Sequence, residues 1–566
     1  MNFVGLIPLI RALPTYSETL ELLSDSGANA ENITVLNIPR SAHPVVIAAL
    51  GEDLECAQLT LTAQSERANI LQQEILAWNP NHDVQLFTKP HTPHYQRASR
   101  GLSQIRQRLE TLAMFSRHTN TANARAVTCA RALMTPTLPP PKFHSHSQSL
   151  QQGKEIRLKQ LLAEWVHTGY RHSAMVTRPG ECSQRGGIID VWPPTDTLPT
   201  RIELFGEQIE SMRRFDPATQ RSREAITVVH VHPAREALPG DGPEAARRLK
   251  EDWLAINQDE IPIEHHTDFE NLANGADFPE LEYYLPWLHP ESGTLLDYLP
   301  EGCLIIVDNW QSFLNAVQEY EQQYLRWSTE QTEIIALPNE RSNTLTSWSE
   351  IQDQISTHPI LVLGGMDHEP QCKLGASFTP VPRHGGKIES LLEYLETKTR
   401  QKEITVVVTH QAGRISELWD DRSKSAPDVI PDTVTTTKNI LDLPSGKSPV
   451  FVHGSIAAGF TLAQSSLNVL SDDEIFGWKG PKPRRPPAQQ AVTTPEDSFT
   501  DFTSGQLVVH IEHGIGRFLR LVSRTINKLQ DEYLQIEYGS GDSLYVPITQ
   551  TDRLTQYVGP NSKTPK

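Results

Sequence analysis

Apolar runs of strand length alternate with helix-length polar stretches over the first 150 residues. Between residues 102 and 112 the apolar positions recur every three or four residues, which is the spacing of one helical face. Strands that alternate with helices predict an α/β domain with a largely parallel sheet, at residues 1–150. The runs expected to form its strands are residues 33–38, 59–61, 84–87 and 126–129.

A different pattern follows a stretch rich in proline, histidine and serine at residues 136–151, which we expect to be a linker. In residues 201–205 two apolar side chains alternate with Arg201 and Glu203, and alternation with a period of two is typical of a strand with one buried face. The pattern therefore predicts a small inserted α+β domain at residues 152–234, whose sheet has one polar, open face.

Two further α/β segments follow the insert. Residues 235–345 are acidic and contain an apolar run at 304–307, which we expect to rejoin the first sheet as the second part of the first α/β domain. Residues 350–475 predict a further α/β domain. Its strands are expected at residues 360–363, 404–408 and 450–452.

The last part of the chain is short and β-rich. Residues 479–487 have the sequence KGPKPRRPP, and because prolines lack amide donors we expect an extended Pro/Arg linker at 479–500. Its basic residues could contact a phosphate backbone, and the alternative is a solvated linker. The strand pattern and tight turns of residues 503–560 predict a small β-barrel.

Charge and composition restrict the partners. The chain has 51 Lys and Arg against 69 Asp and Glu, a net charge of −18, so its surface as a whole repels a phosphate backbone. We therefore expect DNA to bind only weakly or through another segment. No run is apolar over the length of a bilayer, no secretory signal occurs, and the five cysteines lie far apart. We expect a cytoplasmic protein without a membrane partner, a disulfide or a metal site.

The segment from Asn37 to Pro44 has the position of a phosphate-binding loop but lacks its chemistry. It follows an apolar run and precedes a helical pattern, as such a loop must. His43 stands where a lysine would meet the phosphates, Pro44 stands where a hydroxyl would hold magnesium, and the segment has no glycine. We therefore expect a degenerate nucleotide site, with no catalytic residue and no cofactor in this chain.

A second strand end has a similar character. The run at 304–307 ends in Asp308 and Asn309, where an active ATPase would have Asp-Glu, and the amide of Asn309 cannot act as a base. Such a strand end is common, so by itself it does not indicate a nucleotide site. The sequence has no nucleophile elbow and no zinc-protease motif, and nothing else in the residues predicts an enzyme.

Two sets of motifs in the chain are distinctive. The first contains RPGECSQRGGIIDVWPP at 178–194 and RIELFG at 201–206, and the second is VVHIEHGIGRF at 508–518. In this order and spacing they resemble the amino-terminal half of the bacterial transcription-repair coupling factor (Mfd) family. Residues 454–460 and 473–477 resemble the middle region of the same family, so the resemblance covers nearly the whole chain.

The resemblance implies an architecture and partners. The first three segments would form a module similar to the excision-repair protein UvrB, with an inserted domain that binds UvrA. Its inert nucleotide site would include Asp308 and Asn309 as a degenerate Walker B motif. The last segment would be a Tudor-like barrel, shared with CarD-type regulators, that binds the β subunit of RNA polymerase. The DNA-translocating motor of the family, which would bind ATP and magnesium, is expected beyond Lys566.

The resemblance also implies which residues form each surface. The tyrosine-rich hairpin with which UvrB probes damaged DNA is missing after Lys89, where His91, His94 and Tyr95 lead into the next helix, so we do not expect direct damage recognition. The UvrA-binding face would use Arg171, Arg185, Arg201 and Glu203. The alternative for Arg201 and Glu203 is that they form a solvated strand face without a partner.

A polymerase-binding edge is expected at residues 518–525. It would use Phe518, Leu519, Leu521 and Val522, some of which must instead fill the barrel core.

The leading hypothesis is an adaptor of transcription-coupled DNA repair, which links stalled RNA polymerase to UvrA and hydrolyses no nucleotide itself. One alternative is a truncated ATP-dependent DNA translocase, which an in-frame motor with an intact GKT loop beyond Lys566 would establish. The other is a CarD-like regulator that binds polymerase alone. Charge reversal at Arg185 and Arg201 would leave such a regulator unaffected.

Overall fold

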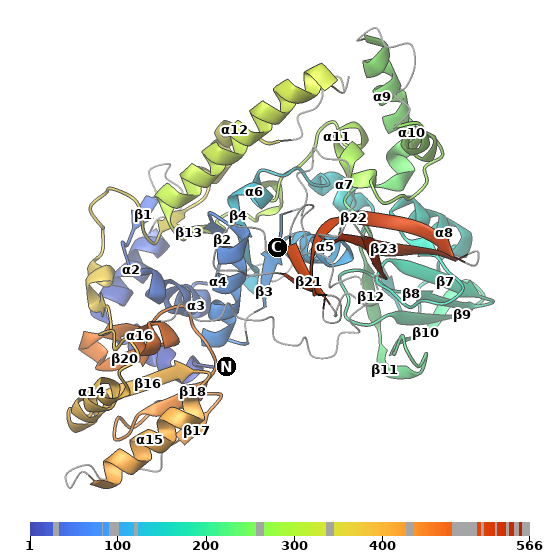
Figure 1. Cartoon of the computed structure of the whole chain (residues 1–566). Coiled ribbons are helices and arrows are strands. Elements are labelled where there is room, and N and C mark those ends of the chain that lie inside the picture. The colour runs from blue at the N-terminus through green and yellow to red at the C-terminus, as the bar shows by residue number, and fades with distance from the viewer. Residues whose placement is uncertain are drawn as a thin grey trace.

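The chain is a mixed α/β protein. In its described part the strands form three six-stranded sheets, one five-stranded sheet and one two-stranded sheet (Figure 1). The expected α/β class with several sheets is thus confirmed. The structure, a computed structural model, describes residues 1–25, 33–81, 83–89, 101–117, 123–255, 265–334, 345–425, 435–477, 507–510, 514–526, 529–538, 543–547 and 554–556.

The first sheet has the order β1-β14-β13-β2-β4-β3, and every neighbouring pair is parallel. Strands buried on both faces suit the continuous apolar runs of the sequence. Their carboxyl ends meet at one edge, where loops bring distant residues together. The strands are β1 (Ile33–Val35), β2 (Gln58–Thr62), β3 (Val84–Phe87), β4 (Arg125–Cys129), β13 (Leu304–Val307) and β14 (Ile360–Val362).

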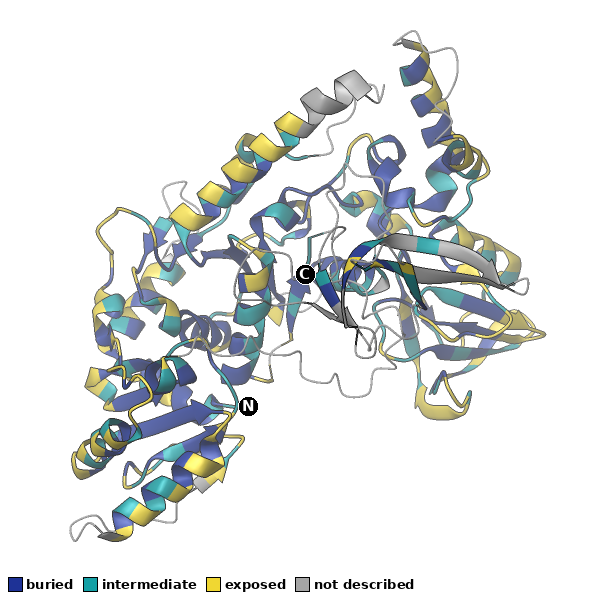
Figure 2. Ribbon diagram, in the orientation of Figure 1, coloured by how far each residue is buried: buried dark blue, intermediate teal, exposed yellow. Residues whose placement is uncertain are grey.

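Helices pack on this sheet through apolar faces. In α5 the residues Ile105, Leu109 and Leu112 are buried, as their spacing predicts. The 25-residue helix α12 extends away from the sheet, and its residues 318–326 are mostly exposed (Figures 1 and 2). The helices are η1 (Val4–Leu6), α1 (Ile7–Arg11), α2 (Pro14–Asp25), η2 (Arg40–Ala42), α3 (His43–Asp53), α4 (Ser65–Trp78), α5 (Leu102–Phe115), α6 (Ala130–Leu133), α12 (Trp310–Ile334) and α13 (Trp348–Ile355).

The structure corrects two expectations about chain organisation. The run at 360–363 does not join the strands of the later α/β segment, because β14 lies between β1 and β13, with Ile360 in register with Ile33 and Ile305. Residues 136–151 are not a linker. There, α7 (Pro140–Ser145) buries Phe143, and β5 (Gln148–Gln151) pairs with β12 (Val228–Val231) in the two-stranded sheet.

The second sheet forms the inserted β-rich unit, in the order β11-β10-β9-β8-β7-β6. One face packs on α8 (Leu158–His167) around Trp165, Ile189 and Met212. The alternation expected in β9 is confirmed, since Ile202 is buried in this core while Arg201 and Glu203 lie on the opposite face. The strands are β6 (Arg171–His172), β7 (Glu181–Arg185), β8 (Ile188–Val191), β9 (Thr200–Phe205), β10 (Gln208–Phe215) and β11 (Ser222–Ile226).

A small helical unit follows the insert and has its own aromatic core around Trp253, Tyr284 and Trp287. Arg235 joins it to the insert, because its guanidinium pairs with Asp277 and Glu282. The elements of this unit are η4 (Pro239–Asp241), α9 (Gly242–Ala255), α10 (His266–Ala273), η6 (Leu281–Tyr284) and α11 (Leu285–Leu288). The next element, η7 (Leu296–Tyr298), packs in the core of the first sheet.

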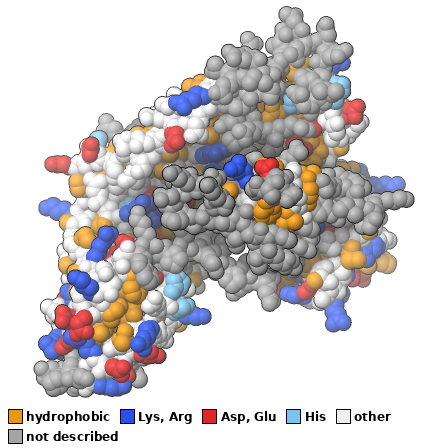
Figure 3. Space-filling view, viewed as in Figure 1, with side chains coloured by type: hydrophobic (Ala, Val, Ile, Leu, Met, Phe, Trp, Pro, Cys, Tyr) orange, Lys and Arg blue, Asp and Glu red, His pale blue; other side chains and the backbone are white. Residues whose placement is uncertain are grey.

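The third sheet has the order β15-β19-β20-β16-β18-β17, and part of it shares one hydrophobic core with the first sheet. Acidic and basic side chains are interspersed on the face of this part seen in Figure 3. Its elements are η8 (Lys373–Ser377), β15 (Phe378–Thr379), α14 (Ile388–Arg400), β16 (Ile404–Thr409), α15 (Ala412–Ser425), β17 (Thr435–Thr437), β18 (Val450–His453), β19 (Phe460–Leu462), η9 (Ala463–Ser465), β20 (Leu467–Leu470) and α16 (Asp472–Phe476).

The last sheet is antiparallel, in the order β24-β23-β22-β21-β25. The linker expected at 479–500 and the stretch from 90 to 100, where a damage-probing hairpin would lie, fall outside the described residues. Among the helices that the structure describes, none has the length and apolar character to cross a membrane. The strands are β21 (Leu507–His510), β22 (Gly514–Ile526), β23 (Leu529–Glu537), β24 (Ser543–Pro547) and β25 (Leu554–Gln556).

Candidate functional sites: a buried charge network and an open sheet face

The segment after β1 is built as the start of a helix. Asn37 has a left-handed backbone with φ of 49°, and its side-chain amide donates to the carbonyl oxygen of His368 over 3.3 Å. A single 3-10 turn then leads into α3, which begins at His43 with Pro44 in its first turn. Proline suits this position because the first amides of a helix have no partner within the helix.

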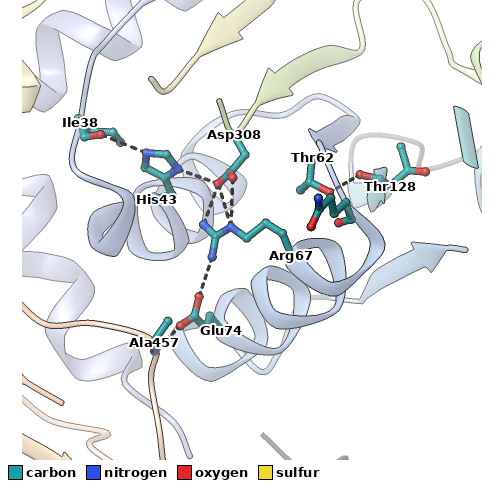
Figure 4. Close-up of polar contacts among 9 residues, drawn as sticks. Ile38, His43, Thr62, Arg67, Glu74, Thr128, Asp308 and Ala457 are labelled. Carbon is teal, nitrogen blue, oxygen red and sulfur yellow. Dashed lines mark hydrogen bonds and ion pairs between the residues drawn. The ribbon is translucent and has the colours of Figure 1, made fainter. Parts of the chain in front are cut away.

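His43 turns inward and binds the acid at the end of β13. Its Nδ1 lies 2.8 Å from Oδ1 of Asp308, and its Nε2 lies 3.1 Å from the carbonyl oxygen of Ile38 (Figure 4). Both partners are acceptors, so both hydrogen bonds form together only when both ring nitrogens carry a proton. The two residues that the sequence singled out in separate segments therefore make direct contact.

Arg67 of α4 also binds the carboxylate of Asp308. Its Nη2 lies 2.7 Å from Oδ1 of Asp308 and its Nε lies 3.1 Å from Oδ2, a bidentate pairing between buried groups. Burial alone would raise the pKa of Asp308, but the hydrogen bonds from His43 and Arg67 outweigh it and hold the pKa of this carboxyl well below its usual range. Asp308 is thus an ionised carboxylate whose acceptor positions face protein donors.

The network continues into the third sheet through Glu74 of α4. Arg67 Nη1 lies 3.4 Å from Oε2 of Glu74, and the backbone amide of Ala457 donates to Oε1 over 2.8 Å (Figure 4). Burial raises the pKa of Glu74, because these two partners offset the loss of water only in part. A line of polar contacts therefore joins the edge of the first sheet to the loop before β19.

Asn309 binds the first backbone amides of α12. Its Oδ1 accepts from the backbone amide of Ser312 over 2.9 Å, and its carbonyl oxygen accepts from the amide of Phe313 over 3.0 Å. These are the contacts of a residue that caps a helix amino terminus. Gly365 lies so close that a Cβ there would come within 2.4 Å of the Asn309 side chain, and its φ is +75°.

A cavity of about 560 Å³ opens beside the network, between the loop after β1 and the first turns of α12. His43, Arg67 and Asp308 contribute to its wall, and so do Asn37 and Asn309. Among the described residues no group of histidine, cysteine and carboxylate side chains is arranged to hold a metal ion. The edge of the first sheet therefore brings together four of the five residues predicted for the degenerate nucleotide site, and Pro44 is the exception. Arg67 and Glu74 also belong to the network, and the sequence did not indicate them.

Three of the four residues predicted for UvrA binding share one face of the insert. Between β8 and β9, Asp190 lies opposite Arg201 and Ile188 lies opposite Glu203. Between β7 and β8, Ile188 lies opposite Arg185. Residues opposite each other across neighbouring strands point to the same side of a sheet. We call this surface, away from α8, the arginine face.

The two arginines of this face differ in their freedom. Arg201 makes a bidentate pair with Asp190 at 2.8 Å, and its guanidinium carbon lies 4.7 Å from the centre of the Phe215 ring. Its side chain is only 19% exposed, whereas that of Arg185 is 52% exposed and approaches Asp190 no closer than 3.8 Å. Arg201 thus supports the face from within, and of these two predicted arginines Arg185 is the one that a partner can reach.

The remaining predicted residue lies apart from these three. Arg171 is in the short edge strand β6, and its Nε donates to Asp277 of the helical unit over 2.5 Å. Asp277 also pairs with Arg235, so the helical unit holds Arg171 in place.

The sequence analysis did not single out a further arginine of the arginine face, Arg213 of β10. It lies opposite Arg201 and 3.5 Å from Glu203. Strand alternation from Met212, which is buried, would have indicated it.

The carboxyl-terminal sheet pairs β22 with two neighbouring strands. In the part of the chain that the structure describes, β22 pairs with β21 through residues 514–517 and with β23 along 517–526. Phe518 packs in the core of this sheet and is 8% exposed, so it is one of the predicted edge residues that fill the core. Leu519 and Val522 are half-buried, and the side chain of Leu521 lies outside the described residues.

Two family models match separate sheets of the chain. That of the UvrB interaction domain matches residues 149–236, which contain the whole insert sheet. That of the CarD-like/TRCF RID domain matches residues 502–558, which contain the carboxyl-terminal sheet.

Relatives extend the similarity over most of the chain. The transcription-repair-coupling factor of Bacillus subtilis (strain 168) is 31% identical over 486 residues, which is 81% of this chain. The chain belongs to the transcription-repair-coupling factor family. The members from Staphylococcus haemolyticus (strain JCSC1435) and Staphylococcus aureus (strain bovine RF122 / ET3-1) are 25% and 26% identical, over 95% and 75% of this chain. The chain spans 40%, 46% and 37% of the lengths of these three family members.

Proposed function

We propose that the chain is an adaptor of transcription-coupled DNA repair, in which the insert binds UvrA and the carboxyl-terminal sheet binds the β subunit of RNA polymerase. The observation that carries the proposal is the match of two different interaction domains to two separate sheets of one chain. Arg185, exposed on the arginine face, is the central UvrA contact in this proposal, with Arg171, Arg201 and Glu203 around it.

The polymerase contact is assigned to β22, along residues 518–525. A partner can bind a sheet by adding a strand to it, and half-buried apolar side chains add contact area. Leu519 and Val522 fit this description. Closure of the five strands into a Tudor-like barrel is part of the same proposal.

We further infer that this chain hydrolyses no nucleotide and holds no cofactor. The Asn37–Pro44 segment would be a phosphate-binding loop whose lysine and hydroxyl are lost, and Asp308 the remnant of a magnesium-binding acid. In support, Asp308 already binds His43 and Arg67, and Asn309 caps α12. ATP, magnesium and most of any DNA binding would belong to a motor segment outside this chain.

Binding of purified partners tests the proposal. Immobilised chain is expected to retain UvrA and RNA polymerase together, and to hydrolyse ATP no faster than buffer with magnesium. Arg185→Glu is expected to raise the Kd for UvrA at least tenfold, since one charge becomes repulsive, and to leave the Kd for polymerase unchanged. Retention of neither partner by the folded wild-type chain would refute the adaptor function.

A further inference from the structure

Phe205, the last residue of β9, is the most exposed large apolar side chain that the structure describes, with 77% of its surface open to solvent. Ile188, the first residue of β8, is 39% exposed. An apolar side chain stabilises a fold when it is buried, so the exposed part of Phe205 adds little to the stability of this one. Single exposed apolar residues are normal, whereas neighbouring ones that form a patch can mark a binding surface.

Both residues lie at one end of the insert sheet. The β7–β8 turn at Gly186 and Gly187 and the β9–β10 turn at Gly206 are adjacent, because the amide of Leu204 donates to the carbonyl oxygen of Gly187 over 2.8 Å. Alternation along β9 places Phe205 on the same side as Glu203. Phe205 and Ile188 therefore form an apolar corner of the arginine face. Arg185 of β7 lies directly opposite Ile188 across the strand pair.

The corner is held rigidly. On the far side of the β9–β10 hairpin, the amide of Ile156 donates to the carbonyl oxygen of Glu207 over 2.8 Å, and the amide of Ile209 donates to that of Lys154 over 2.9 Å. Gly206 takes a φ of +65°, which lets the turn stay tight. An aromatic side chain on a fixed backbone loses little conformational entropy when a partner covers it.

We propose that Phe205, with Ile188 beside it, is the apolar anchor of the arginine face and enters an apolar pocket on UvrA, next to an acidic group that pairs with Arg185. The inference rests on the proposed function of this face. A buried aromatic next to an arginine is the composition that dominates binding energy at protein interfaces. A symmetric pair of this chain is a poorer occupant, because two-fold symmetry would bring the same arginines together.

Substitution of Phe205 tests the anchor in the full chain. Phe205→Ala is expected to raise the Kd for UvrA roughly ten- to hundredfold, mostly through faster dissociation. Phe205→Leu keeps an apolar group and is expected to retain most of the affinity. The matched control is Leu443→Ala, because Leu443 is 52% exposed but lies outside the insert. Phe205→Ala and Leu443→Ala should both leave the thermal unfolding midpoint and the Kd for polymerase unchanged, since both side chains are exposed.

The outcomes separate the anchor from the adaptor function. If Arg185→Glu abolishes UvrA binding while Phe205→Ala behaves like Leu443→Ala, the anchor is overturned and the adaptor function stands. If the folded wild-type chain does not bind UvrA, both are overturned. If sedimentation shows a wild-type dimer that Phe205→Ala dissociates, the corner binds a second copy of the chain, and the anchor on UvrA is overturned.

Discussion

Asp308 carries a buried negative charge at the end of β13, and the cation of Arg67 lies against it with two hydrogen bonds. Removal of one partner from such a pair leaves a largely buried charge that has lost its opposite charge. Arg67→Met is therefore expected to lower the free energy of unfolding by about 3–5 kcal/mol, measured by urea denaturation.

A matched surface pair provides the control for this experiment. Arg247 pairs with Glu244 and Glu251 on the exposed side of α9, and Arg247→Met should leave the free energy of unfolding nearly unchanged, because solvent screens such pairs. The double variant Arg67→Met with Asp308→Asn should recover part of the loss, because the charge of Asp308 is then removed together with its cation, while Glu74 still loses its contact with Arg67. A loss below about 1 kcal/mol in Arg67→Met would show that Asp308 does not depend on its cation.

At the residue scale, the sequence identified one half of this network. His43 and Asp308 stand out because they occupy positions where a nucleotide site would have other residues. Arg67 does not stand out, since it lies within an ordinary helix pattern and meets Asp308 across 241 positions of chain. Such long-range pairs depend on strand order, which the local pattern does not contain.

Among the elements, α12 depends on Asn309 for its start. An N-cap residue satisfies a backbone amide that has no partner inside the helix, and its loss typically costs about 1 kcal/mol. Asn309→Ala is expected to lower the free energy of unfolding by this amount, while Asn309→Asp should keep the cap and the stability. Equal losses in both variants would contradict the capping role. The position directly before a helical pattern is itself a recognisable cap signal.

The junction of α7 and β12 should make stability depend on pH. Burial, followed by the nearby charges of His230, Arg117 and His144, lowers the pKa of His232 to about 4, while its ring stacks on Phe143 at 5.3 Å. The unfolded chain, with a histidine pKa of about 6.5, binds this proton more readily than the folded chain. Stability is therefore complete above pH of about 6.5 and is lost as pH falls toward 4.

His289 reinforces the same dependence. Burial, followed by the charge of Lys142, lowers its pKa to about 4, although Asp241 lies 3.7 Å away. Each histidine contributes a loss on the order of 3 kcal/mol over this window. Unfolding measured at pH 7.5, 6 and 5 should show the decline, and the variant His232→Gln should show a shallower one. An unchanged slope in that variant would place the effect elsewhere.

For the whole molecule, the class of fold was predictable but the membership of strands was not. Buried strands at 84–87 and 304–307 follow directly from apolar runs, and both lie in the first sheet. The run at 360–363 has the same pattern as β16, yet it pairs with β1 and β13. The apolar content of a run predicts that the strand is buried. Which strands it pairs with depends on how the helices between them pack.

The first and third sheets should unfold together and the insert separately. Trp78 connects the two sheets, since its ring centre lies 5.0 Å from that of Phe3 and 6.0 Å from that of Phe460, within one shared core. The insert has a core of its own. Trp78→Ala is expected to cost about 3–5 kcal/mol. In hydrogen exchange, β2 and β20 should both lose protection in this variant, because they belong to the same cooperative unit, while β9 keeps its protection. Loss confined to β2 would mean that the third sheet is an independent unit, and equal loss in β9 would mean that the insert shares the stability of the whole.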